Sequence, residues 1–82
     1  MLKPYLLSII GDDQPGLVDA IAEQIAVHGG NWQTSQLSHL AGKFAGIVLI
    51  SIPTAEAGAL EESLKRLSDR GLSVRVTEAG TE

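Results

Sequence analysis

The sequence predicts an α+β fold of the ferredoxin-like type, in which a four-stranded antiparallel sheet carries both helices on one face. Short apolar or alternating segments indicate four strands. Two segments with helical spacing of apolar residues lie between them, so the predicted order is β-α-β-β-α-β. Each helix links two parallel strands through a right-handed crossover. Two such units combine most simply as a split βαβ sheet.

The first half of the chain predicts a strand, a helix and a polar strand. Residues 5–10 are a short apolar run and indicate a mostly buried strand. A helix is predicted from Pro15 to the pair Gly29-Gly30, since glycine suits the left-handed conformation just past a helix end. Its apolar residues recur every four positions, at Leu17, Ile21 and Ile25. Residues 31–40 are polar with weak alternation, which favours a strand at the sheet edge.

The second half predicts a central strand, a helix and a half-buried strand. Residues 44–52 are almost continuously apolar, as is typical of a central strand. Thr54 is the expected N-cap of the second helix, which ends at Gly71. Residues 72–77 alternate between apolar and polar side chains. Both helices cover the same face, so the other face must be polar or must pack on something else.

The length and composition restrict the function classes. With 82 residues, the chain is expected to form a single domain over residues 1–82. The net charge of −4 argues against binding of nucleic acid or an anionic membrane. The absence of cysteine excludes thiolate chemistry and agrees with a reducing compartment. The first apolar run is too short for a signal peptide, so a cytoplasmic location is expected.

The segment "GDDQPGLV" at residues 11–18 joins the first strand to the first helix. Its simplest interpretation is a helix start, with Pro15 in the first turn and Asp12 or Asp13 as the cap. A phosphate loop is excluded by the glycine spacing and by the two adjacent acids. Two carboxylates alone are weak evidence for a metal site.

Catalysis and RNA binding find little support. His28 and His39 are the two histidines, and neither belongs to a spacing that suggests a catalytic arrangement. Residues 43–50, "KFAGIVLI", superficially resemble an RNA-binding strand. Such a strand needs several aromatic side chains to stack bases, and here Phe44 is the single aromatic residue.

A small ligand that contacts the main chain remains as an alternative to the helix cap. Gly16 has no side chain, so a small molecule can approach the backbone closely. The N–H groups that begin a helix suit a carboxylate, and a nearby acidic side chain suits an ammonium group. Both charges together describe a free amino acid. Asn31 begins the next strand and could add an amide contact, from the same subunit or a neighbouring one.

The sequence also resembles an ACT domain, a regulatory βαββαβ module, from about Tyr5 to Thr77. "GDDQPGLV" resembles the ligand loop of that family, and "GGN" follows the first helix at the expected interval. The segment "HGGNWQTSQLSHLAGKFAGIVLISIP" resembles the glycine cleavage system transcriptional repressor group more closely. That group usually carries two tandem ACT domains, and this chain has room for one. The family often has arginine at the position of Gln14.

The resemblance implies a non-enzymatic regulatory module that binds a small amino acid, such as glycine or serine, without a cofactor, metal or catalytic residue. It implies a homodimer joined at the sheet edges and contact with a transcriptional regulator protein, without direct contact to nucleic acid. The implied ligand-binding residues are Asp12, Asp13, Gln14, Pro15, Gly16, Leu17 and Asn31. Two alternatives stay open: a ligand-independent dimerisation or interaction domain, and an N-terminal regulatory fragment of a larger enzyme such as a formyltetrahydrofolate deformylase.

Overall fold

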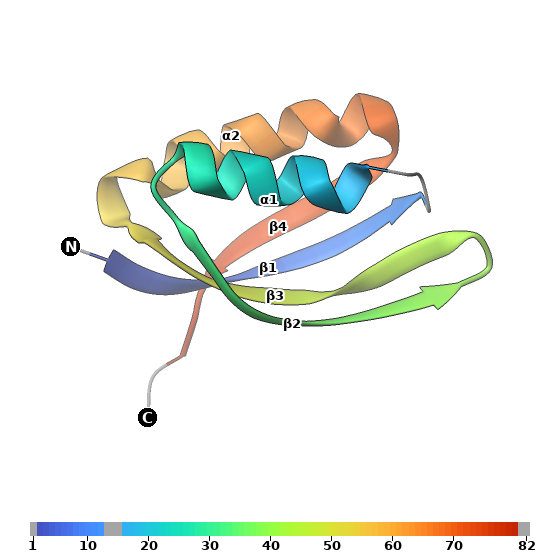
Figure 1. The fold of residues 1–82 in the computed structure, drawn as a ribbon, viewed down its shortest axis with the longest axis horizontal. Helices are drawn as coiled ribbons and strands as arrows, with labels where there is room; N and C mark the ends of the chain where they lie inside the picture. Colours follow the sequence, from blue (N-terminus) through green and yellow to red (C-terminus); the bar gives the residue numbers. More distant parts are fainter. Residues whose placement is uncertain (1, 13–15, 81–82) are drawn as a thin grey trace.

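The computed structural model describes residues 2–12 and 16–80, and it confirms the predicted element order (Figure 1). The elements are β1 (Leu2–Asp12), α1 (Leu17–Val27), β2 (Asn31–Leu40), β3 (Lys43–Pro53), α2 (Ala57–Lys65) and β4 (Leu72–Glu78), with 3-10 segments at Thr54–Glu56 and Arg66–Arg70. The strands form one antiparallel sheet in the order β2-β3-β1-β4. Both helices lie over the same face of this sheet, and no described helix or strand covers the opposite face. No helix within the described ranges is both long and apolar enough to cross a membrane.

The pairing of β1 with β3 forms the centre of the sheet. Its register runs without interruption from Leu2 opposite Pro53 to Asp12 opposite Lys43. Alternate residues of the two strands point toward the helices, and those side chains are buried. They join apolar residues of both helices and of β4 in one core, formed by Leu7, Ile9, Leu17, Ile21, Ile25, Phe44, Val48, Ile50, Ile52, Leu60, Leu64 and Leu72.

The two helices differ in how well their ends were predicted. Gly29 has a φ of 77° and donates to the Ala26 carbonyl at 3.0 Å, while the Gly30 N–H donates to the Ile25 carbonyl at 2.8 Å. These two bonds close α1 as a Schellman motif, as the glycine pair predicted. The prediction of Thr54 as N-cap of the second helix is wrong. A 3-10 turn begins at Thr54, and the N-cap of α2 is Glu56. The proline that precedes Thr54 stops the strand, and the chain uses this extra turn before the α-helix begins.

β2 lies at the sheet edge and β3 inside the sheet, as predicted. The two strands approach each other closely at Gly46, which lies opposite Leu37. A Cβ atom on Gly46 would come within 2.0 Å of the Gln36 carbonyl oxygen, which belongs to the main chain and cannot rotate away. Glycine at this position therefore permits the spacing between the edge strand and its neighbour.

We expect Gly46→Ala to lower the free energy of unfolding by about 2 kcal/mol or more, because the added methyl group overlaps backbone atoms. Urea denaturation followed by circular dichroism measures this change. Gly58→Ala is the matched control, since Gly58 lies in α2 with open space around it. That control should be neutral or stabilise the protein by about 0.5–1 kcal/mol. Equal stability of the Gly46 variant and the wild type would contradict the close approach.

Candidate functional site: the loop between β1 and α1

The predicted ligand loop lies at one end of the sheet, where β1 ends and α1 begins (Figure 1). Asp12 is the last residue of β1, and its side chain forms an ion pair with Lys43, the first residue of β3. The Asp12 backbone N–H donates to the Gly71 carbonyl at 3.2 Å. The carboxylate is therefore held between the start of β3 and the start of β4.

Gly16 is the N-cap residue of α1, and it has a left-handed φ of 83°. Its carbonyl accepts a hydrogen bond from the Ala20 N–H at 2.9 Å, which closes the first turn of the helix. A glycine offers no side-chain oxygen to the first N–H groups of the helix, so Gly16 itself does not cap them. Of the two expected caps of α1, Asp12 does not take this role, because its carboxylate is paired with Lys43, and Asp13 lies outside the described residues.

Of the other loop residues, Leu17 is described by the structure, and residues 13–15 are not. Leu17 is completely buried in the core, so it fixes the start of α1 against the sheet and offers no side chain to a ligand. The resemblance placed Leu17 among the binding residues, and its buried side chain limits it to backbone contact. Asp13, Gln14 and Pro15 lie outside the described residues.

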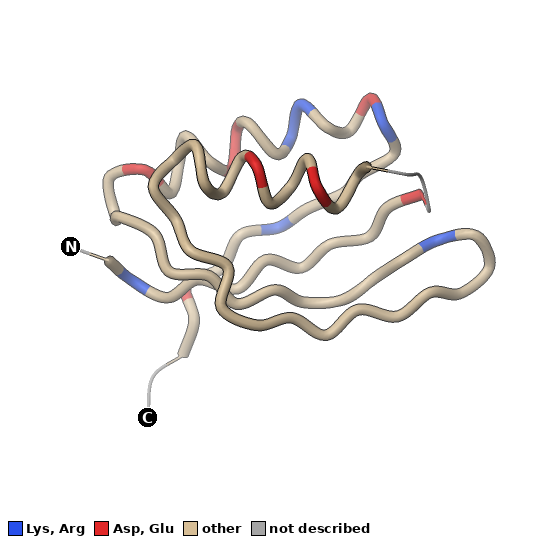
Figure 2. The backbone as a smooth tube through the Cα atoms, viewed as in Figure 1, with Lys and Arg blue, Asp and Glu red and all other residues tan. Residues whose placement is uncertain are grey.

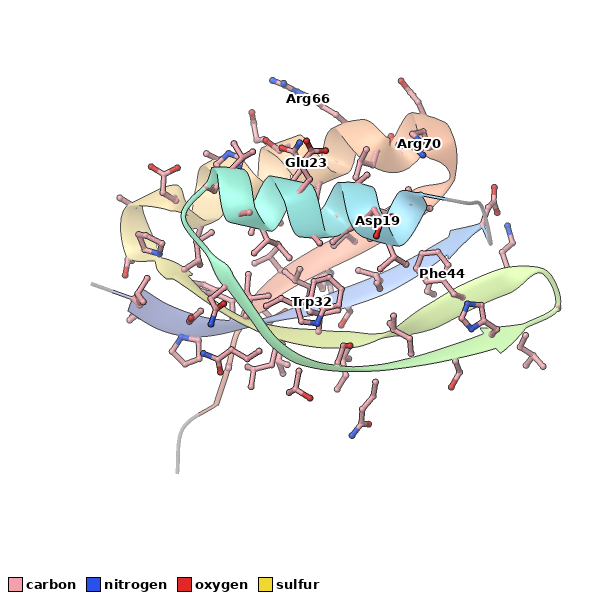
Figure 3. All side chains as sticks on the ribbon, in the orientation of Figure 1. Asp19, Glu23, Trp32, Phe44, Arg66 and Arg70 are labelled. Carbon is pink, nitrogen blue, oxygen red and sulfur yellow. The ribbon has the colours of Figure 1, made fainter. Side chains whose placement is uncertain are left out.

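Arg70 is a residue of this site that the sequence did not single out. It is the last residue of the 3-10 segment after α2 and extends from the end of the helix layer at which α1 begins (Figure 3). A Cβ atom placed on Gly16 would lie 3.9 Å from Nη2 of Arg70. The guanidinium group therefore lies beside the N-cap of α1, where its charge adds to the positive end of the helix dipole.

Asn31 lies at the opposite end of the sheet within one chain. It pairs with Ser51 of β3, and Ser51 in turn pairs with Pro4 of β1. Pro4 and Asp12 are eight residues apart on the same strand, which corresponds to about 26 Å. The structure therefore does not bring Asn31 to the loop of its own chain.

Strand topology could have identified the missed residues. In an antiparallel pair, the end of one strand lies beside the start of the next. The order β2-β3-β1-β4 therefore places Lys43 and Gly71 next to Asp12. Gly71 has a φ of 86°, and a Cβ atom there would lie 2.3 Å from an Asp12 carboxylate oxygen. The residue just before it, Arg70, reaches the site for the same reason.

The histidines do not contribute to this site. Nδ1 of His28 donates to the Gln24 carbonyl at 2.8 Å, four residues earlier in α1. The ring of His39 lies 6.1 Å from that of Phe44, centroid to centroid. Within residues 2–12 and 16–80, no group of three His, Cys, Asp or Glu side chains is arranged to hold a metal ion. The described chemistry at the loop consists of one carboxylate, two cationic side chains and the start of a helix.

The split βαβ sheet defines a ferredoxin-like fold, and comparison with known families agrees. The ACT domain family model matches residues 3–77, so the chain belongs to the ACT domain family. A comparison with curated protein sequences finds no match.

Solved structures share the fold at low sequence identity. A protein of unknown function from Galdieria sulphuraria is 22% identical, with a TM-score of 0.86 over 100% of this chain and 48% of its own. A proposed glycine cleavage system transcriptional repressor is 18% identical, with a TM-score of 0.87 and the same coverage of 100% and 48%. A formyltetrahydrofolate deformylase from Pseudomonas putida is 18% identical, with a TM-score of 0.77 over 93% of this chain and 29% of its own. The chain thus spans about half the length of the first two.

We expect Lys43→Met to change the free energy of unfolding by less than about 1 kcal/mol, because the ion pair with Asp12 is solvated. The Lys43 and Asp12 side chains are 58% and 41% exposed, so water screens their attraction. Urea denaturation measures the change, with Lys65→Met on the exposed side of α2 as the control. A loss of 2 kcal/mol or more in the Lys43 variant alone would show that the pair holds the sheet end together.

Proposed function

We propose that this chain is a non-enzymatic regulatory module that binds a free amino acid at the β1–α1 loop and thereby changes its pairing with itself or with a regulator protein. The observation that supports this most directly is the left-handed glycine at the N-cap of α1, with the Arg70 guanidinium beside it. The N–H groups that begin a helix and a guanidinium group both favour a carboxylate. Arg70 supplies the positive charge that related loops often obtain from arginine at the position of Gln14.

The ammonium group of the same ligand needs a negative partner, and Asp12 is the described carboxylate at this end of the sheet. Its side chain forms an ion pair with Lys43. Because both side chains are about half exposed, exchanging the lysine for a ligand ammonium costs little. Asp13, in the adjoining part of the loop, is the second candidate for this role. The ligand carboxylate would then contact the start of α1 and Arg70, which precedes β4, and the ligand ammonium group would contact Asp12 at the end of β1.

Edge pairing of two copies would complete this site with Asn31. β2 is an edge strand of ten residues that contains no proline and no Lys, Arg, Asp or Glu. Figure 2 shows its tube without blue or red. Charges and prolines are the usual protection of an edge against pairing, so this edge is open to another strand. If two β2 strands pair antiparallel with Asn31 opposite Leu40, Asn31 of the second copy lies at the sheet end that holds Asp12, because Leu40 and Asp12 both align with Lys43.

A thermal melt against a panel of free amino acids, with glycine and serine included, tests the proposal. A specific ligand at 100 times its dissociation constant stabilises the folded state by about 2.7 kcal/mol. For a domain of this size, that corresponds to an increase in Tm of about 10–20 °C. No shift with any amino acid at millimolar concentration would leave the alternative of a ligand-independent interaction domain.

Gly16→Val should abolish the ligand-induced shift in Tm, because its side chain would stand beside the Arg70 guanidinium that the ligand carboxylate is proposed to contact. The matched control is Gly42→Val in the β2–β3 turn. Gly42 has a similar φ of 77°, but nothing lies within 4 Å of an added Cβ atom. Both variants lose stability through the left-handed backbone, by about 1–2 kcal/mol. Titration calorimetry on the folded variants should show binding by the Gly42 variant alone, and binding by both would refute the close-approach argument.

A further inference from the structure

The uncovered face of the sheet carries an apolar centre with polar flanks. Three rows of aligned residues cross its middle, and each row runs in the strand order β2, β3, β1, β4. The first row is Thr34, Leu49, Leu6 and Thr77, and the central row is Gln36, Ile47, Ser8 and Arg75. The third row is Ser38, Ala45, Ile10 and Ser73. The two inner strands supply the apolar residues, and the two outer strands supply hydroxyl groups, an amide and one guanidinium.

This distribution differs from that of a face adapted to water. Five large apolar side chains are exposed among the described residues, and strand alternation places four of them on this side: Leu2, Ile10, Leu40 and Ile47. Ile47 lies at the centre and is 44% exposed. Large exposed apolar side chains that gather on one face of a domain often mark an interaction surface.

Two shallow hollows flank Ile47. One, of about 450 Å³, lies on the β4 side and is lined by Ser8, Ile10, Ala45, Ile47, Ser73 and Arg75 among others. The other, of about 190 Å³, lies on the β2 side and is lined by Leu6, Thr34, Gln36, Ile47 and Leu49 among others. Ile47 borders both hollows, so the face presents a ridge beside a larger depression.

We infer that this face is covered by a second copy of the chain, packed sheet against sheet with the two-fold axis along the strand direction. Such an axis places β3 of one copy over β1 of the other, and β2 over β4. In the central row, Ile47 then faces Ser8 of the second copy and enters the larger hollow, which Ser8 lines. The arrangement belongs to the aligned class of sheet packing, in which strands of the two sheets run within about 30° of each other.

The same axis makes every central row complementary. Leu49 faces Leu6 of the other copy, and Ala45 faces Ile10, so that apolar side chains meet in the neighbouring rows. Arg75 faces the Gln36 side-chain amide, whose oxygen can accept from the guanidinium group. An axis across the strands would instead stack Arg75 on Arg75 of the second copy, at a cost from like charges.

The area reaches that of the smallest stable interfaces. The molecule measures 38 Å along its longest axis and 16 Å along its shortest, which limits the face to about 600 Å². Two copies together would bury up to about 1,200 Å², the lower limit for stable interfaces. Packing of the two sheets leaves both sheet edges free, so this contact is compatible with pairing through β2. It needs no ligand, because it does not involve the β1–α1 loop.

Sedimentation equilibrium without amino acids tests the inference. The wild type should self-associate, and Ile47→Lys should weaken that association by at least about tenfold, because it places an ammonium group in an apolar hollow. Val27→Lys is the matched control, since Val27 is 68% exposed at the end of α1, away from this face. Circular dichroism shows whether both variants stay folded. A monomeric wild type, or equal association of both variants, would overturn the inference.

A charge exchange tests the direction of the axis and separates this face from the β2 edge. Gln36→Lys should weaken association, because it faces Arg75 of the second copy, and Gln36→Lys combined with Arg75→Glu should restore it. The two residues lie on opposite edge strands, about 14 Å apart within one chain, so neither an intrachain contact nor pairing through β2 explains such a rescue. Failure of the double variant to recover would refute the strand-parallel arrangement.

Discussion

The antiparallel register between β1 and β3 determines where the other features of this chain lie. Eleven consecutive residue pairs, from Leu2–Pro53 to Asp12–Lys43, align the two central strands without a bulge. Because side chains alternate along a strand, this one register divides the residues into those under the helices and those on the uncovered face. It also places the Asp12–Lys43 ion pair at the end of the sheet, beside the start of α1. A shift by one residue would bury Lys43 and expose Phe44.

The sequence was sufficient for the fold because its periodicities are clear, and it was insufficient for the site because the site depends on contacts between distant segments. The apolar spacing from Leu17 to Ile25 and the pair Gly29-Gly30 defined α1 from local rules alone. The position of Arg70 beside Gly16 joins segments 54 residues apart, and no local pattern contains it. Local rules offered Asp12 or Asp13 as the cap of α1. For Asp12 the outcome is decided by a distant segment, since Lys43 from the β2–β3 hairpin pairs with its carboxylate.

The positions of Asp12 and Asn31 show that a single chain cannot bring all the expected ligand contacts together. They lie at opposite ends of the sheet, separated by about 26 Å along the strands. An antiparallel pair of β2 strands would remove that separation, because the two-fold axis exchanges the ends of the strands. On the proposed function, ligand binding and edge pairing are then thermodynamically linked, since a ligand held by both copies stabilises their association.

The two proposed contacts use different groups of the same sheet and therefore need not compete. The β2 edge presents backbone N–H and C=O groups in the plane of the sheet, and the uncovered face presents side chains perpendicular to that plane. Because the face contact places β2 of one copy over β4 of the other, the β2 edges of the two layers lie on opposite sides. A chain that uses both contacts would therefore extend into an open assembly, in which one contact responds to an amino acid and the other persists without it. The small core of an 82-residue domain gives a reason for the second contact. With helices on one face alone, the sheet leaves Ile10 and Ile47 exposed to water. Packing against a second copy would bury these side chains, as a third layer of secondary structure does in a larger domain.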